Sequence, residues 1–168
     1  TASHNVSMFR SINAIVVGCN QKNNRDPVME LTEGDVSAAL HGLGQWQLVS
    51  QAPPDHGARV NRFLHEVEKR FNWNSPIRAI MAELMLRGPQ TVGELRTNAG
   101  RLTHLDASEH VREILGELQR LDPPLVVELP RQTGQSATRF AHLLGGAVEA
   151  ATVARAAIAA SEPAPKAG

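Results

Sequence analysis

The sequence predicts an α+β, mainly helical protein built from two tandem winged-helix domains, which are a variant of the helix-turn-helix. The first observation is an order of elements that occurs twice: helical patterns, then a short strand, a turn and a returning strand. The second is a fixed spacing of 75 residues between apolar positions of the two helices that precede the hairpins. The matched pairs are Val36 with Val111, Leu40 with Leu115 and Leu43 with Leu118. A fixed offset along an apolar helical face indicates duplicated modules.

The first module is expected over residues 1–61. Ser11 fits a helix N-cap, and apolar residues follow it at helical spacing as far as Cys19. A polar loop rich in asparagine comes next. Thr32 then fits the cap of a second helix that ends at Gly44, and two acidic residues behind the cap suit its positive N-terminal end.

A wing-like hairpin is expected to close the first module. Leu48-Val49 fits a short strand, residues 53–57 a turn rich in proline, and Arg59-Val60 the returning strand. Residues 62–74 are predicted as a connecting helix and linker, because large apolar side chains recur in them every four positions.

The second module, residues 75–145, repeats the plan. Ser75-Pro76 begins a helix that Gly88-Pro89 stops. Thr91 and Glu94 fit a capping box, which starts a short helix. The remaining elements are a longer helix from Asp106, a strand at 125–129, a turn at 130–136 and a returning strand at 139–143.

Residues 146–168 form an Ala-rich tail that ends in a segment containing two prolines. Alanine favours helix, but few large apolar residues are present to bury a helical face. We therefore expect a partly disordered or edge-packed tail, in preference to a coiled-coil dimer seam.

Composition sets limits on the kind of protein. Lys+Arg and Asp+Glu balance at 17 each in 168 residues, so any attraction to nucleic acid must come from local patches. Cys19 is the only cysteine, which excludes an internal disulfide. The chain contains no apolar run of about 18 residues and no basic-then-apolar opening, so we expect a cytoplasmic protein with no membrane partner.

The sequence also argues against an enzyme. The seven histidines are not arranged as a metal site, and Cys19 has no nearby histidine or second cysteine. Glycine-rich phosphate loops are absent, and no catalytic grouping of serine, cysteine or carboxylate residues can be assembled. We expect a non-enzymatic protein with no metal and no cofactor.

Three stretches of the sequence are similar to motifs of one protein family. They are NQKNNRDPVMEL at 20–31, LRGPQTVGELR at 86–96 and VVELPR at 126–131. Together they resemble the YceH family of bacterial proteins, over about residues 11–144. The resemblance implies tandem winged helices and brings no catalytic residues with it.

The resemblance also implies an apolar helix ahead of the first module, and no counterpart of it precedes Thr1. Without that helix, the apolar side chains of the first module would lose one wall of their core. Leaving them in water would cost on the order of 1.5–3 kcal/mol each. We therefore expect the natural protein to contain this helix.

DNA association is the first functional hypothesis, because the last helix of a helix-turn-helix enters the major groove and the wing touches the DNA backbone. Charge disfavours that docking here. Residues 30–47 contain three acids and no Lys or Arg, and residues 106–120 contain four acids against two arginines. Such helices would be repelled by the two phosphate rows.

Positive charge and amides gather elsewhere, and these residues are the candidate nucleic-acid contacts. The candidates are Lys22, Asn23, Asn24, Arg25, Arg96, Arg101, Arg131 and Arg139. The alternative for the asparagine-rich loop is that its side chains bind nearby backbone and stabilise the loop. The alternative for Arg96 and Arg101 is pairing with the acidic helix that follows.

Two hypotheses for function remain open. In the first, the protein is a DNA-associated, regulator-like protein that grips double-stranded DNA by the second wing and the loop. In the second, it is a protein–protein adaptor or a self-associating module, such as a homodimer, whose acidic helices face a protein partner. Winged-helix domains serve both purposes, so the fold does not decide between them.

Overall fold

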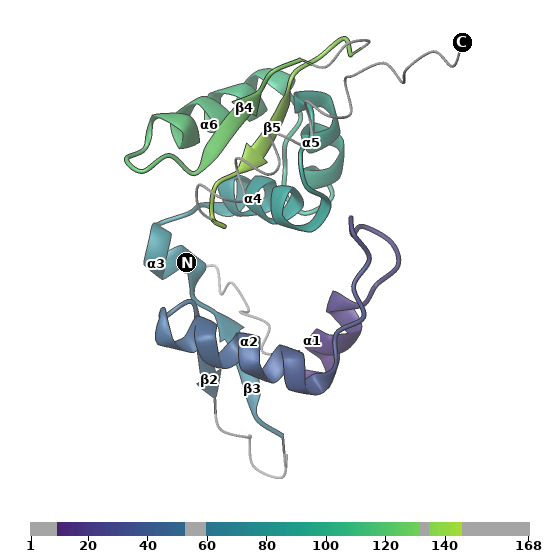
Figure 1. The fold of residues 1–168 in the computed structure, drawn as a ribbon. Helices are drawn as coiled ribbons and strands as arrows, with labels where there is room; N and C mark the ends of the chain where they lie inside the picture. The colour runs from purple at the N-terminus through teal and green to yellow at the C-terminus, as the bar shows by residue number, and fades with distance from the viewer. Residues whose placement is uncertain (1–9, 53–59, 132–134, 146–168) are drawn as a thin grey trace, which may run out of the picture. The chain divides into compact units, whose positions relative to one another are not determined.

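The computed structural model describes residues 10–52, 60–131 and 135–145. The chain divides into two compact units, Thr1–Asn74 and Ser75–Gly168. Each unit combines α-helices with one small antiparallel sheet (Figure 1). This confirms the predicted α+β class in which helices predominate. The predicted tail at 146–168 and the predicted turn at 53–57 lie outside the described residues.

Among its described residues, the first unit contains two helices followed by a hairpin and a short third helix. Its sheet has the order β1-β3-β2, and Phe63 on the central strand pairs with Arg10 on one side and Gln51 on the other. Its elements are β1 (Arg10–Ser11), α1 (Ile12–Cys19), α2 (Glu33–Gln45), β2 (Val49–Ala52), β3 (Arg62–His65) and α3 (Val67–Phe71).

The helix starts in the first unit follow from the capping residues. The Ser11 hydroxyl accepts a hydrogen bond from the backbone N–H of Ala14 at 3.3 Å. Thr32 and Asp35 form a reciprocal capping box, in which the hydroxyl and backbone N–H of Thr32 hold the pKa of the Asp35 carboxyl below its usual range. Both predicted caps are confirmed. Helix α2 runs one residue past the predicted stop at Gly44, to Gln45.

The predicted connecting helix at 62–74 is partly wrong. Arg62–His65 is strand β3, and only Val67–Phe71 is helical. The returning strand therefore starts at Arg62, after the predicted Val60, and Arg59 lies outside the described residues. Residues 62–65 are a strand because they pair with β1 on one side and β2 on the other. These partners are distant in sequence and leave no local pattern, so the four-residue spacing of apolar side chains was misleading.

The second unit contains three helices followed by a hairpin. Gln90 adds a single bridge to the hairpin: its N–H donates to the carbonyl of Phe140 at 3.0 Å, and the Phe140 N–H donates back at 2.8 Å. Gln90 thus occupies the position at the sheet edge that β1 holds in the first unit. The elements are α4 (Ser75–Arg87), α5 (Val92–Ala99), α6 (Ser108–Arg120), β4 (Val126–Leu129) and β5 (Arg139–His142).

Most element ends in the second unit match their signals. Gly88 adopts a left-handed φ of 70° directly after α4, which confirms the predicted stop. The Thr91–Glu94 capping box is also confirmed. Helix α6 starts at Ser108 instead of Asp106, behind Ala107, whose side chain offers no cap.

The two units differ in how well their cores are filled. In the second unit, α4, α5 and α6 surround a closed core, whose fully buried side chains include Ile80, Met81, Leu84, Leu95, Val111, Leu115 and Leu118. In the first unit, α1 has no buried residue and Val36 is the only one on α2.

The repeat seen in the sequence is also present in the structure, but side chains at matched positions differ in burial. Helices α2 and α6 have the same length and lie 75 residues apart. Leu118 is 2% exposed, whereas its match Leu43 is 40% exposed, so the expected inward position of Leu43 is wrong. The physical reason is that no described helix of the first unit corresponds to α4, which supplies the third wall of the second core.

Candidate nucleic-acid interface

Each unit has a groove between its last long helix and its hairpin. In the first unit the groove lies between α2 and β2–β3 and measures about 440 Å³. In the second it lies between α6, the hairpin and the start of α5, and measures about 710 Å³. The groove of the second unit is lined by Thr91, Val92, Gly93, Ser108, Arg112, Gln119, Glu128, Arg131, Ser136, Ala137, Thr138 and Phe140.

The two grooves occupy equivalent places in the repeat. Ser37 lines the first and Arg112, 75 residues later, lines the second. On the hairpins, Gln51 pairs with Phe63 and Glu128 pairs with Phe140, and all four residues line their respective grooves. The grooves can therefore be compared position by position.

The groove of the second unit presents groups that suit phosphate. It includes the first residues of α5 and α6, where unpaired backbone N–H groups and the helix dipole favour anions. Arg112 and Arg131 add two cations, and Glu128 is the one acid among the described lining residues. Arg112 bonds to Glu109 at 2.6 Å, but both side chains are more than half exposed. Such an exposed pair contributes less than about 1 kcal/mol, so Arg112 can exchange partners.

The groove of the first unit is chemically different. None of the described residues that line it is Lys, Arg, Asp or Glu, and Leu40, Val49 and Phe63 give it apolar walls. On its rim, the side chains of His41 and Gln45 are 3.2 Å apart. The described residues of this groove offer no fixed charge to a phosphate.

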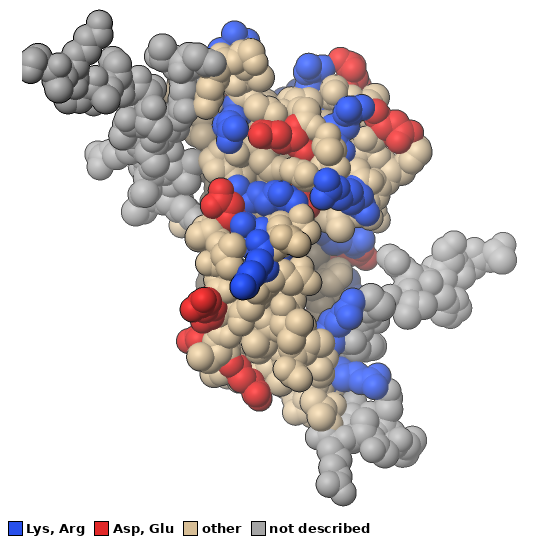
Figure 2. Space-filling model, turned by 90° about the vertical axis from the view of Figure 1, so that its right-hand side faces the viewer, with Lys and Arg blue, Asp and Glu red and all other residues tan. Residues whose placement is uncertain are grey.

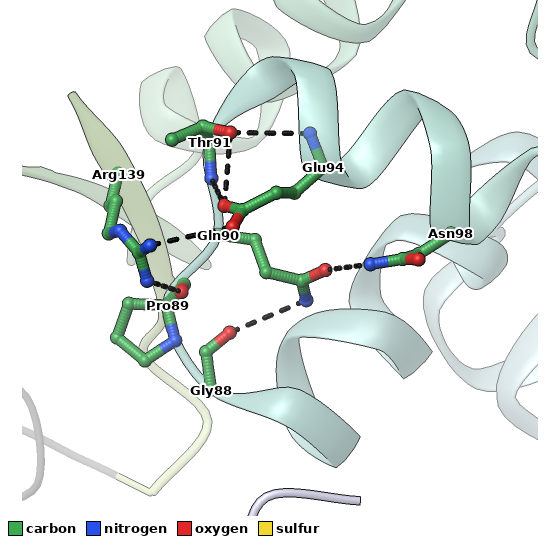
Figure 3. A network of polar contacts seen from close by, with 7 residues as sticks. All are labelled: Gly88, Pro89, Gln90, Thr91, Glu94, Asn98 and Arg139. Atoms are coloured by element: carbon green, nitrogen blue, oxygen red, sulfur yellow. Dashed lines mark hydrogen bonds and ion pairs between the residues drawn. The ribbon is translucent and has the colours of Figure 1, made fainter. Parts of the chain in front are cut away.

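Among the candidate cations, Arg139 is tied into its own unit. Its Nη1 donates to the backbone carbonyl of Pro89 at 3.1 Å, and its Nη2 lies 3.4 Å from the Glu94 carboxylate. Figure 3 shows both contacts meeting at the start of α5, beside the Thr91 cap. Arg139 therefore joins β5 to α5.

Burial and hydrogen bonding have opposite effects on the pKa of the Glu94 carboxyl. Burial raises the pKa of its carboxyl, but the backbone N–H and hydroxyl of Thr91 bond to the ionised form, and the charge of Arg139 assists. These contacts outweigh burial and hold the pKa of Glu94 below its ordinary value. The carboxylate is thus ionised at neutral pH and holds both the cap and Arg139.

The buried side-chain amide of Gln90, the residue before the Thr91 cap, was not predicted from the sequence. The Gln90 side chain, in a residue only 4% exposed, donates to the carbonyl of Glu83 at 2.9 Å and accepts from the Asn98 amide at 2.8 Å. These two bonds join α4 to α5; Figure 3 shows the one to Asn98, and a longer one of 3.5 Å to the carbonyl of Gly88. The only local signal was a glutamine directly after Gly-Pro, which does not predict burial.

The asparagine-rich loop is held by side chains that bind backbone. The Asn20 amide donates to the carbonyl of Leu31 and accepts from the Leu31 N–H, both at 2.7 Å. Arg25 donates to the carbonyls of Gly18 at 2.7 Å and Asn24 at 2.8 Å. Bonds from side chain to backbone are what the structural alternative expects, and the structure shows them at Asn20, which was not among the candidates, and at Arg25.

The other candidates lie on the surface. Lys22, Asn23 and Asn24 are exposed at the tip of the loop in the first unit. Arg96 is exposed and its Nη1 lies 3.4 Å from the backbone carbonyl of Asp106, so its contact is with backbone and not with a carboxylate. Arg101 is exposed after α5. Of the eight candidates, the structure brings Arg131 into the groove, together with Arg112, which sequence reasoning had not selected.

Comparison with known proteins settles the family. The family model described as "Protein of unknown function, DUF480" matches residues 9–135. The chain belongs to this family. A UPF0502 protein of Geobacter sulfurreducens is 48% identical over 136 residues, which cover 81% of this chain and 61% of that protein. A UPF0502 protein of Azoarcus sp. is 43% identical over 137 residues, covering 82% and 60%.

These matches confirm the resemblance to the YceH family, because YceH is the family named UPF0502. The chain spans about three fifths of the length of the UPF0502 relatives it matches. Their names state no ligand or activity, so the chemistry of the site has to be argued from the chain itself.

The surface carries charges of both signs. On the face drawn in Figure 2, blue and red side chains alternate instead of forming one broad basic area. None of the described helices is long and apolar enough to cross a membrane. Within the described ranges, no three His, Cys, Asp or Glu side chains come together as metal ligands.

Proposed function

We propose that each unit is a winged-helix domain and that the protein is a non-enzymatic, DNA-associated, regulator-like protein of the cytoplasm. The order of elements supports the domain assignment. In the second unit three described helices precede the hairpin, and Gln90 forms a single bridge to β5. The first unit repeats the sheet order and the last two helices. Helix-turn-helix domains with a hairpin wing are frequent DNA-binding modules.

The groove of the second unit carries this proposal. Arg112 and Arg131 would bind phosphate oxygens, since the guanidinium group matches phosphate geometry with two parallel donors. The hydroxyls of Ser108 and Thr138 line the same groove and are suited to the same oxygens. The first turn of α6 has no side-chain cap, so its N–H groups are available to an anion.

Salt-dependent binding to a fluorescent duplex tests the proposal. The full 168-residue chain is titrated against mixed-sequence DNA at several salt concentrations, with the double variant Arg112→Ala/Arg131→Ala beside it. The slope of log K against log salt should fall by about 2 in the variant, because two phosphate contacts are lost. Arg120→Ala, an exposed arginine of α6 outside the groove, is the control and should leave the slope unchanged. No binding of the wild-type chain at about 50 mM salt contradicts the proposal.

A second candidate function is protein docking or self-association. The observation in its favour is apolar exposure on the first unit: Trp46 is 70% exposed and Val17 64%. Exposed apolar side chains of this size can form part of a protein interface. Sedimentation tests it: a dimer that survives 1 M salt and is lost in Trp46→Ser supports this function, and a monomer under all conditions excludes self-association.

A further inference from the structure

The two equivalent grooves differ in charge at matched positions. Position 37 of the first unit is a serine where the second unit has Arg112. The groove of the first unit has no charged lining residue among those described, whereas that of the second contains two arginines. Phosphate contact by a module requires cations, since neutralising phosphates supplies most of the affinity.

The helix beside the first groove, α2, carries negative charge that would repel the phosphates of DNA. Helix α2 presents Glu33 and Asp35 in its first turn, and both are exposed. Residues 30–47 contain no Lys or Arg to offset them. The described lining of the first groove therefore supplies no cation, and the helix beside it presents acidic residues.

In the second unit, the exposed face of α6 carries an acidic stripe. Glu109, Glu113 and Glu117 follow one another every four residues, so they project from one side of the helix, and all three are exposed. A helix inserted in the major groove lies between two phosphate rows. This stripe would face those phosphates, which disfavours insertion and leaves the backbone as the contact.

We infer that DNA contact is confined to the second unit and is made to the phosphate backbone, without reading base sequence. This inference rests on the proposed function and adds to it which unit binds and what it recognises. The second-unit groove grips phosphates through Arg112 and Arg131. The acidic stripe on α6 stays outside the major groove, and the first unit stays off the duplex.

Single-charge substitutions at matched positions test which unit binds. Arg112→Gln and Ser37→Glu each change the charge by one unit in the same direction, at exposed positions 75 residues apart. With the full chain and a 20-base-pair duplex at low salt, Arg112→Gln should weaken binding about fivefold, and Ser37→Glu should leave it within twofold. An equal loss in both variants overturns the confinement to one unit. Circular dichroism and urea unfolding confirm that each variant is folded.

Two further measurements test the absence of base reading. In competition between unrelated duplexes of equal length, affinities should agree within twofold, and a preference above tenfold overturns the inference. The double variant Glu113→Gln/Glu117→Gln should change affinity less than threefold, because those carboxylates lie outside the groove. An increase above tenfold would place α6 against phosphates and would also overturn it. If the wild-type chain binds no duplex at all, the proposed function itself fails, which is a distinct outcome from a strong sequence preference.

Discussion

Arg139 on β5 donates a hydrogen bond of 3.1 Å to the carbonyl of Pro89, fifty positions earlier in the chain. The same guanidinium lies 3.4 Å from the Glu94 carboxylate. The contact ties the returning strand of the hairpin to the start of α5, and so fixes two walls of the candidate groove. Arg139 is thus a positioning residue for the groove.

Removing this tether should destabilise the second unit. Arg139→Ala should lower the free energy of unfolding by about 1 kcal/mol, because a partly exposed charge-assisted hydrogen bond is lost. Arg131→Ala, which removes an exposed arginine at the end of β4, should change it by less than about 0.5 kcal/mol. Urea denaturation measures both. A larger loss in Arg131→Ala than in Arg139→Ala would refute the tether.

Because the matched leucines of the two units differ in burial, truncating them should lower the free energy of unfolding by different amounts. Leu118→Ala should cost about 2–5 kcal/mol, since the side chain is 2% exposed and its loss leaves a cavity. Leu43→Ala, at the matched position, should cost less than about 1 kcal/mol, because that side chain is already 40% exposed. Thermal or urea unfolding of the two variants gives the comparison, and equal costs would show that Leu43 is buried in solution.

Two glycines of the α5 region should respond in opposite ways. A Cβ at Gly100 would lie 2.5 Å from the carbonyl oxygen of Arg96, so Gly100→Ala forces the backbone to shift and should cost about 1–3 kcal/mol. A Cβ at Gly93 meets nothing within 4 Å, so Gly93→Ala should stabilise the helix by about 0.5–1 kcal/mol. Urea midpoints decide, and a neutral Gly100→Ala would contradict the close approach.

The Thr91–Glu94 cap predicts a pH-dependent contribution to stability. Because the pKa of Glu94 is lowered in the folded protein, its ionised form stabilises the fold above its ordinary pKa of about 4.5. That contribution is lost as the pH falls through the lower folded value. Glu94→Gln should therefore be less stable than wild type at pH 7, by under about 1 kcal/mol since the side chain is partly exposed. The difference should shrink as the pH falls below about 4.5 and the carboxylate is protonated; a difference that does not change with pH means the loss does not come from the carboxylate charge.

Local signals were enough for the starts of α2 and α5 and for the end of α4. The capping boxes at Thr32 and Thr91 and the stop at Gly88 lie within a few residues of what they control, and the structure confirms each. The strands were harder, because β3 and the Gln90 bridge depend on partners far along the chain. Strands of only two to four residues are too short for an alternating pattern to be recognised where apolar side chains also have a helical spacing.

The candidate site was less predictable than the fold. Arginine count and spacing identify cations, but not which of them bond to backbone carbonyls. Arg25 and Arg139 do so, at Gly18 and Pro89, through contacts that have no sequence signature. Arg112 went unselected because it lies on an acidic helix, although it lines the groove with Arg131.

Nuclear magnetic resonance on the isotope-labelled full chain is the most direct test of the account. Adding a 20-base-pair duplex should shift the amide signals of the second-unit groove, at Thr91–Gly93, Ser108, Arg112, Arg131 and Thr138, and those of α2 should stay in place. Shifts along α2 and the hairpin of the first unit, or no shifts at any site under low salt, would contradict it.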